Sequence, residues 1–168
     1  SCDLLMAISK QTYGINKHVC VDKPRIEGLD LTYVPHGIDE NVFKPVDDLD
    51  ADYIDFKSKI DKRDANFIAL FNSRNIHRKR VSDLGLGYAK MCANLTKEQA
   101  EKCLLVLHTD AVDQHGTDLP ALVNALCPYP VAFSNQKLDL KLLNYLYNLA
   151  DVTCNPSSAE GFGLSHME

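Results

Sequence analysis

The stretch Phe67-Ile68-Ala69-Leu70-Phe71 is a continuous apolar run, and it decides the fold class of this chain. Continuous apolar strands are typical of parallel sheets that are covered on both faces, because both sets of side chains are then buried. A polar loop, residues 72–80, follows this run, and apolar side chains then recur at helical spacing over residues 80–95. A strand, a loop and a helix in this order form the unit from which parallel sheets are built.

The same alternation continues to the end of the chain. Apolar runs predict further strands at residues 103–107, 130–133 and 152–154, and helical spacing predicts helices at 119–126 and after Asp139. Asp is a favoured N-cap residue, so Asp139 is expected to begin the last of these helices. The sequence therefore predicts an α/β domain with a Rossmann-like, doubly wound parallel sheet. In the usual strand order, the first strand of this domain lies in the middle, next to the last.

The first 64 residues are less regular. They predict a short strand at residues 3–8, a polar helix at 9–19 and a strand at 29–34, which are too few elements to form a core. Weakly patterned acidic sequence follows, with a short helix around residues 53–60. We therefore divide the chain into three parts, which are residues 1–34, a connecting region at 35–64, and the main domain at 65–168.

The composition argues against several classes of protein. The 168 residues carry a formal net charge of −5, with a pI near 5.6, whereas a general nucleic-acid binder would have a basic face. The sequence has no run of about 18 apolar residues, so we expect no transmembrane segment. The six cysteines lie in apolar or helical runs without metal-ligand spacing, which favours reduced thiols in a cytoplasmic protein. They are Cys2, Cys20, Cys92, Cys103, Cys127 and Cys154.

Two loops of different chemistry are predicted to meet at the sheet. The loop 72–80 contains the densest short cluster of basic residues, and the loop 156–163 contains a glycine turn. In a doubly wound sheet, the loops that leave the central strands flank the crevice in which ligands bind. Cations and backbone amides that converge there would form a diphosphate site. The first strand is followed by Asn-Ser-Arg-Asn rather than by a glycine fingerprint, which argues against an NAD enzyme.

Two carboxylates, Glu160 and Glu168, bracket the Gly161-Phe162-Gly163 turn. A glycine turn that leads into a helix brings backbone N–H groups close to a phosphate, and the helix dipole favours the negative charge. Carboxylates would repel a phosphate, but they accept hydrogen bonds from hydroxyl groups. A site that combines phosphate and hydroxyl recognition indicates a sugar nucleotide.

The segment from Glu160 to Glu168 resembles the E-x7-E motif of retaining glycosyltransferases with the GT-B fold, in the form found in glycosyltransferase group 1 (family 4). Arg74 and Lys79 are similar to the diphosphate-binding Arg and Lys of that family. Residues 34–39 resemble the motif at its domain junction. The resemblance implies a hexosyltransferase that moves a sugar from a nucleoside diphosphate to an unknown acceptor.

The resemblance also implies a domain organisation. Residues 1–34 would be the tail of the N-terminal, acceptor-binding domain, and residues 35–64 the interdomain connection. Residues 65–168 would be the nucleotide-sugar-binding domain, truncated at its C-terminus. We therefore expect this chain to be a fragment that is inactive by itself. A peripheral membrane contact through the missing N-terminal domain is left open.

Individual roles follow from the resemblance as well. Arg74 and Lys79 would neutralise the departing diphosphate, and Glu160 would bind hydroxyls of the transferred sugar. The other donor contacts would be Glu168 to the ribose, Asn135 or Gln136 to the base, and the backbone of Gly161, Phe162, Gly163 and Leu164 to sugar and phosphate. This chemistry is expected to need no metal ion and no cofactor.

Two positions depart from the family. His36-Gly37 stands where Asn-Gly is usual, and Arg80 follows Lys79 where glycine is common. Two other functions are compatible with the same sequence features. One is a non-catalytic nucleotide-binding or interaction fragment, and the other is a nucleotide-sugar epimerase on the same fold. The nucleotide base, the sugar and the acceptor are not identified by the sequence.

Overall fold

The computed structural model describes residues 3–21 and 29–168 of the chain. These residues belong to two compact units. The larger unit comprises Asp39–Ala159 together with Glu168, and the smaller comprises Ser1–Ile38 together with Glu160–Met167. The larger unit therefore contains nearly all of the predicted α/β domain, together with the segment 39–64 that the sequence assigns to the connecting region.

The larger unit contains a four-stranded parallel sheet. Its strands are β3 (Phe67–Asn72), β4 (Cys103–His108), β5 (Val131–Ser134) and β6 (Val152–Thr153), and their order is β5-β4-β3-β6. Every pair of neighbours is parallel. The prediction that the strand at 67–71 is central and lies beside the last strand is therefore confirmed.

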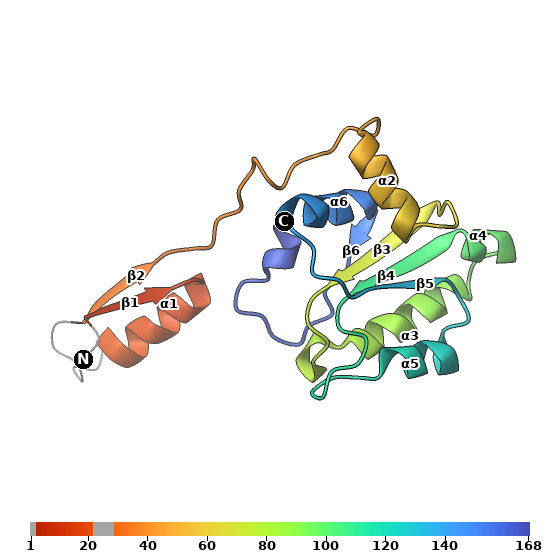
Figure 1. Cartoon of the computed structure of the whole chain (residues 1–168). Helices are drawn as coiled ribbons and strands as arrows, with labels where there is room; N and C mark the ends of the chain where they lie inside the picture. The colour runs from red at the N-terminus through yellow and green to blue at the C-terminus, as the bar shows by residue number, and fades with distance from the viewer. Residues whose placement is uncertain (1–2, 22–28) are drawn as a thin grey trace. The chain divides into compact units, whose positions relative to one another are not determined.

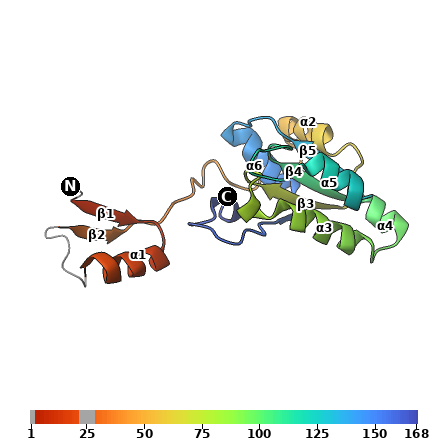
Figure 2. The ribbon, with the colours of Figure 1, turned by 90° about the horizontal axis from the view of Figure 1, so that it is seen from below.

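Helices cover both faces of this sheet. Figure 1 shows α3 (Val81–Cys92) and α5 (Leu119–Leu126) on one face, and α2 (Ala51–Ile60) and α6 (Leu140–Leu149) on the other. Figure 2 shows the same helices and strands from below. A short helix that the sequence analysis missed, α4 (Lys97–Glu101), precedes β4.

Two hydrophobic cores lie on opposite faces of the sheet, because successive side chains of a strand point in opposite directions. Phe71 packs in the core between the sheet and the helices α3 and α5. Leu70 packs in the core between the sheet and the helices α2 and α6. Both side chains are completely buried. Burial of one such side chain contributes about 1.5–3 kcal/mol, so these alternating positions fix the register of the central strand.

The helix starts follow from side-chain caps. Asp139 begins α6 as predicted, and its carboxylate accepts a hydrogen bond from the Leu142 N–H at 2.8 Å. Thr96 and Gln99 form a reciprocal capping box that begins α4. Such a cap replaces a missing intrahelical partner and contributes about 1 kcal/mol.

The segment before α2 is held on α6 by two asparagine side chains. The Lys44 N–H donates to Asn144 Oδ1 at 3.1 Å, and the Val46 N–H donates to Asn148 Oδ1 at 2.9 Å. These bonds satisfy backbone groups that no sheet or helix would satisfy. Together with the packing of Tyr53 and Phe56 in the core of the larger unit, they join residues 39–64 to that unit.

The smaller unit contains a parallel pair of strands, β1 (Leu4–Ala7) and β2 (Asp30–Tyr33), with the helix α1 (Lys10–Asn16) between them in sequence. Ser9 caps α1 by accepting a hydrogen bond from the Thr12 N–H at 3.1 Å. A π-helical turn, η1 (Lys17–Val21), continues this helix. The predicted strand, helix and strand are therefore confirmed.

Five of the six cysteines, Cys20, Cys92, Cys103, Cys127 and Cys154, are free thiols. Cys2 lies outside the described residues. In the described part of the chain, no helix has the length and apolar character required to cross a membrane.

Candidate functional site

The loop of residues 72–80, here called the arginine loop, leaves the carboxyl end of the central strand β3 (Figure 1). It includes Arg74 and ends in a short 3₁₀ turn, η2 (His77–Lys79). Arg80 then begins α3 in the left-handed conformation, with φ 50° and ψ 41°. Glycine adopts this conformation without steric cost, which accounts for the glycine that is common here in the family that the sequence resembles.

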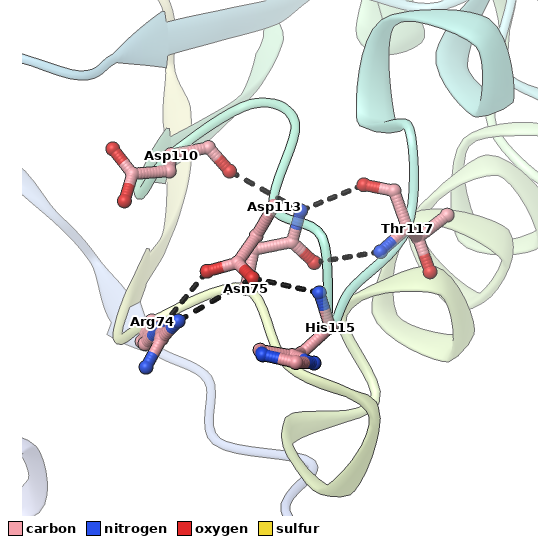
Figure 3. A network of polar contacts seen from close by, with 6 residues as sticks. All are labelled: Arg74, Asn75, Asp110, Asp113, His115 and Thr117. Atoms are coloured by element: carbon pink, nitrogen blue, oxygen red, sulfur yellow. Dashed lines mark hydrogen bonds and ion pairs between the residues drawn. The ribbon is translucent and has the colours of Figure 1, made fainter.

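Asn75 joins the arginine loop to the loop of residues 109–118, here called the β4 loop. Its side-chain amide donates to the carbonyl oxygens of Asp110 at 3.2 Å and Thr117 at 2.7 Å, and its Oδ1 accepts from the Thr117 N–H at 3.2 Å (Figure 3). Asn75 is only 1% exposed. A buried side chain with these bonds fixes both loops, since breaking them would leave buried polar groups without partners. The sequence analysis did not identify this residue.

A close backbone approach adds to this connection. The His77 N–H donates to the His115 carbonyl oxygen at 3.1 Å. At the next residue, a Cβ atom on Gly116 would lie 2.1 Å from the Asn75 carbonyl oxygen, well inside contact distance. Only glycine therefore allows the two loops to approach this closely.

Arg74 forms an ion pair with Asp113 of the β4 loop (Figure 3). Arg74 Nε donates to Asp113 Oδ2 at 2.8 Å, and a second guanidinium nitrogen donates to Oδ1 at 3.4 Å. These hydrogen bonds lower the pKa of Asp113 and raise that of Arg74. The Asp113 side chain is 7% exposed and the Arg74 side chain 58%, so much of the guanidinium faces solvent.

Lys79, the second predicted cation, has a different environment. It is buried, at 8% exposed, at the end of the 3₁₀ turn. The sequence analysis treated Arg74 and Lys79 as an equivalent pair. The structure distinguishes them, because one cation is accessible to an external anion and the other is enclosed by protein.

The loop that leaves β6 meets the arginine loop, as the switch-point argument predicts. The N–H of Ser158 donates to the Arg78 carbonyl oxygen at 2.9 Å, and the Arg78 side chain donates to the Ala159 carbonyl oxygen at 2.7 Å. Ser157 is held locally, because both its N–H and its hydroxyl donate to Asn155 Oδ1. The prediction that the loops from the two adjacent strands meet is therefore confirmed for the part of the second loop that ends at Ala159.

The glycine turn itself belongs to the smaller unit. Gly163 has φ 82° and ψ 52° and begins the 3₁₀ turn η3 (Leu164–His166). Phe162 packs edge-on against His36, with ring centroids 5.1 Å apart, so the turn contacts the predicted junction motif. Glu160 and Gly161 are exposed, and Leu164 is exposed at 39%. The meeting of this turn with Arg74 and Lys79 stays a prediction.

Glu168, the predicted ribose ligand, is held by a short polar chain in the larger unit. The Tyr147 hydroxyl donates to Glu168 Oε2 at 2.6 Å and accepts from the Asn72 side-chain amide at 2.7 Å. Burial raises the pKa of Tyr147, and the hydrogen bond to Glu168 raises it further. This chain connects the end of β3 with the second glutamate of the motif, and the sequence analysis did not include Tyr147.

Asn135 and Gln136, the candidates for base recognition, are exposed residues directly after β5. They line a cleft that α2 and α6 border, together with Lys141 and Tyr145. The preceding residue, Ser134, contacts His108 Nδ1 at 2.9 Å. The role of the two amides in base recognition stays a prediction.

Among residues 3–21 and 29–168, no group of three or more His, Cys, Asp or Glu side chains has the arrangement of a metal site. At the carboxyl ends of β3 and β4, the larger unit presents the guanidinium of Arg74 and the carboxylate of Asp113.

Comparisons with known proteins concern the fold. No protein-family model and no curated protein matches this sequence. Solved structures do match over 95% of the chain. They include OtsA without ligand (TM-score 0.66, 16% identity), a structure described as trehalose-6-phosphate from E. coli bound with UDP-2-fluoro glucose (0.63, 17%), and an α,α-trehalose 6-phosphate synthase from Burkholderia multivorans (0.64, 10%).

The chain has an α/β fold with parallel sheets that matches part of the GT-B fold of these structures. At these identities the similarity shows the fold, and the fold expected from the E-x7-E resemblance is confirmed. The chain spans about 40% of the length of the structures that it matches. In the larger unit, the arginine loop and the loop after β6 lie at the carboxyl ends of adjacent parallel strands, where α/β sheets bind ligands.

Proposed function

We propose that this chain carries the donor-binding part of a retaining glycosyltransferase, which transfers a sugar from a nucleoside diphosphate to an acceptor hydroxyl. The observation that carries the proposal is the half-exposed guanidinium of Arg74 at the carboxyl end of the central strand of a GT-B fold. Arginine is well suited to phosphate oxygens, since its planar donors can bind two of them at once.

In the proposed reaction, the bond between the anomeric carbon and the diphosphate oxygen breaks, and its electron pair leaves with the diphosphate. The acceptor oxygen forms the new bond on the same face of the sugar, and its proton passes to the released phosphate. Arg74 would stabilise the charge that develops on the leaving group, and preorganised cations act most strongly on such charge. Glu160 would bind hydroxyls of the sugar, and Glu168 those of the ribose.

The comparisons suggest which donor to test first. The E. coli structure that the chain resembles is described as bound with UDP-2-fluoro glucose. We therefore infer that UDP-glucose is the first donor candidate for this chain. The names of the neighbours contain trehalose phosphate, which makes a sugar phosphate, such as glucose 6-phosphate, the first acceptor candidate. This chemistry needs no metal ion.

The test is a calorimetric titration of the chain with UDP. Removing a charge-assisted contact to phosphate costs about 1.5–3 kcal/mol, so Arg74→Ala is expected to weaken UDP binding by at least about 10-fold. Arg63→Ala is the matched control, because Arg63 is an exposed arginine that precedes the amino end of the same strand. Equal UDP affinity in Arg74→Ala and the unaltered chain would contradict the proposal.

A second assay separates the proposed activity from the alternatives. The chain is incubated with UDP-glucose, with and without glucose 6-phosphate, and the products are analysed. Acceptor-dependent release of UDP with a new glycosidic bond supports the transferase. Conversion of the donor to another sugar nucleotide without acceptor would contradict the transferase and indicate an epimerase. Binding without turnover would restrict this chain to the nucleotide-binding function.

A further inference from the structure

Asp113 faces Arg74 from the β4 loop rather than from the arginine loop (Figure 3). Its carboxylate contacts the Nε edge of the guanidinium, with bonds of 2.8 Å to Nε and 3.4 Å to the second nitrogen. A guanidinium has five N–H donors, and this side-on arrangement uses two of them. The remaining donors belong to the end of a side chain that is 58% exposed.

The carboxylate of Asp113 is itself held in place. Its Oδ1 accepts a hydrogen bond from the His115 N–H at 2.8 Å, and its backbone carbonyl accepts from the Gly116 N–H at 3.0 Å. The loop around it is anchored on the buried Asn75 amide. Asp113 is therefore a fixed group, and Arg74 is the longer and more exposed partner that it orients.

The Arg74 side chain of this ion pair is 58% exposed, and solvent screens the interaction of such a side chain, so stabilising the loops is a weak reason for this contact. Its stronger effect is on the conformational freedom of Arg74. A free arginine loses rotamer entropy when it binds a ligand, and that loss weakens binding. A guanidinium that is already oriented has less to lose.

We propose that Asp113 is a positioning residue for the donor, which holds Arg74 side-on so that the free end of its guanidinium binds the diphosphate of a nucleotide sugar. This inference rests on the proposed function, because it assigns a diphosphate to Arg74. It gives the β4 loop a role at the site that the sequence analysis did not assign to it. In the alternative, Asp113 would compete with the diphosphate for Arg74, and the diphosphate would displace it on binding.

The test uses inorganic pyrophosphate, which has no base and no sugar, and measures its affinity for the full chain by calorimetry. Ordering one long side chain costs about 0.5–1.5 kcal/mol, so Asp113→Ala is expected to weaken pyrophosphate binding roughly 3- to 10-fold. Asp113→Asn keeps an oxygen that accepts from Arg74 Nε, so it is expected to weaken binding less.

Asp110→Asn is the matched control. It removes a carboxylate from the same loop, and in Figure 3 only the backbone carbonyl of Asp110 bonds another of the residues drawn. Pyrophosphate affinity is expected to stay constant or to rise slightly, because a nearby negative charge is lost. Tighter pyrophosphate binding in Asp113→Ala would overturn the inference and identify a competing anion.

A double-mutant cycle separates positioning from general damage to the loop. In the Arg74→Ala background, Asp113→Ala is expected to have no further effect on pyrophosphate affinity, since its action passes through Arg74. An equal loss in both backgrounds would assign Asp113 a merely structural role. If Arg74→Ala alone has no effect, the proposed function fails. If Arg74→Ala weakens binding and Asp113→Ala does not, only the positioning role fails.

Discussion

The loops that leave β3 and β6 start from adjacent parallel strands but are stabilised in different ways. The arginine loop is fixed by the buried side chain of Asn75 and by a backbone approach at Gly116 that leaves no room for a side chain. The loop after β6 is held through Ala159 by bonds to Arg78 and by contacts within the loop. The first arrangement depends on buried groups, and the second on partly exposed ones.

This difference matches the chemistry proposed for each loop. A cation that stabilises charge on a leaving group acts best when it is fixed in advance, because reorganisation during the reaction costs energy. Residues that bind the hydroxyls of a sugar must admit the sugar first. We therefore expect substitutions in and around the arginine loop to lower the free energy of unfolding strongly, and substitutions in the loop after β6 to lower it little.

The largest expected effect is that of Gly116→Ala. The new Cβ would lie 2.1 Å from the Asn75 carbonyl oxygen, so one of the two loops must move. Overpacking of this kind lowers the free energy of unfolding by about 1–3 kcal/mol. Because the chain has no Trp, the measurement is chemical denaturation followed by circular dichroism.

Gly87→Ala is the control for this substitution. A Cβ at Gly87 meets no atom within 4 Å, and the residue lies in the interior of α3. Alanine in an exposed helix position is expected to raise the free energy of unfolding by about 0.5–1 kcal/mol. Equal changes at the two glycines would show that the approach of the two loops is not a tight constraint.

The next effect is that of Asn75→Ala, which removes all three hydrogen bonds between the side chain and the β4 loop. Buried groups left without a partner cost about 1–3 kcal/mol, so we expect a loss of about 2 kcal/mol in unfolding free energy. Hydrogen exchange of the Thr117 amide should accelerate, because Asn75 Oδ1 is its acceptor. Asn94→Ala, which removes an exposed side-chain bond to the Lys90 carbonyl, is expected to change stability far less.

The elements that the sequence predicted well are those whose signal is local. The apolar run at 67–71 and the Asp139 cap depend on neighbouring residues, and both predictions are confirmed. The missed helix α4 also had a local signal, the Thr96–Gln99 capping box. The sequence could therefore have predicted it.

The residues that the sequence could not assign depend on distant partners. Asn75 looks like an ordinary polar loop residue, and its role arises from bonds to Thr117, which is 42 positions away. In the same way, Arg74 and Lys79 are equivalent in a list of basic residues. Only the packing of the turn shows that Lys79 is buried while Arg74 is half exposed.

Tyr147→Phe tests whether the two ends of the proposed site bind different parts of the donor. It removes the hydroxyl that bridges Asn72 and Glu168, so we expect a loss of about 1 kcal/mol in stability. If Glu168 binds the ribose, the variant should weaken UDP binding and leave pyrophosphate binding unchanged. Calorimetric titration with both ligands measures the difference.

Tyr88→Phe is the matched control, because its hydroxyl donates to the Pro130 carbonyl oxygen at 3.0 Å in the core of the larger unit. It removes the same kind of group, so it should lower stability by a similar amount without affecting UDP binding. Parallel losses of UDP and pyrophosphate affinity in Tyr147→Phe would argue against a separate ribose contact at Glu168.

The smallest effect is expected where the two loops are most alike. Each enters its following helix through a left-handed residue, which is Arg80 in the arginine loop and Gly163 after β6. A side chain makes this conformation costly by about 1 kcal/mol, whereas glycine adopts it freely. Glycine also has more conformational freedom to lose on folding, which offsets part of the gain. We therefore expect Arg80→Gly to raise the free energy of unfolding by about 0.5 kcal/mol.

The substitution also removes the ion pair between Arg80 and Asp83, whose side chains are 55% and 61% exposed. Exposed pairs of this kind contribute little, so the backbone effect should dominate. Arg80→Ala separates the two contributions, because it removes the charge and keeps the Cβ atom that makes the conformation costly. In chemical denaturation, the free energy of unfolding should be higher for Arg80→Gly than for the unaltered chain. For Arg80→Ala it should be equal to that of the unaltered chain or lower. If both variants were stabilised equally, repulsion among the neighbouring cations would be the cause, and the left-handed backbone at Arg80 would carry no strain.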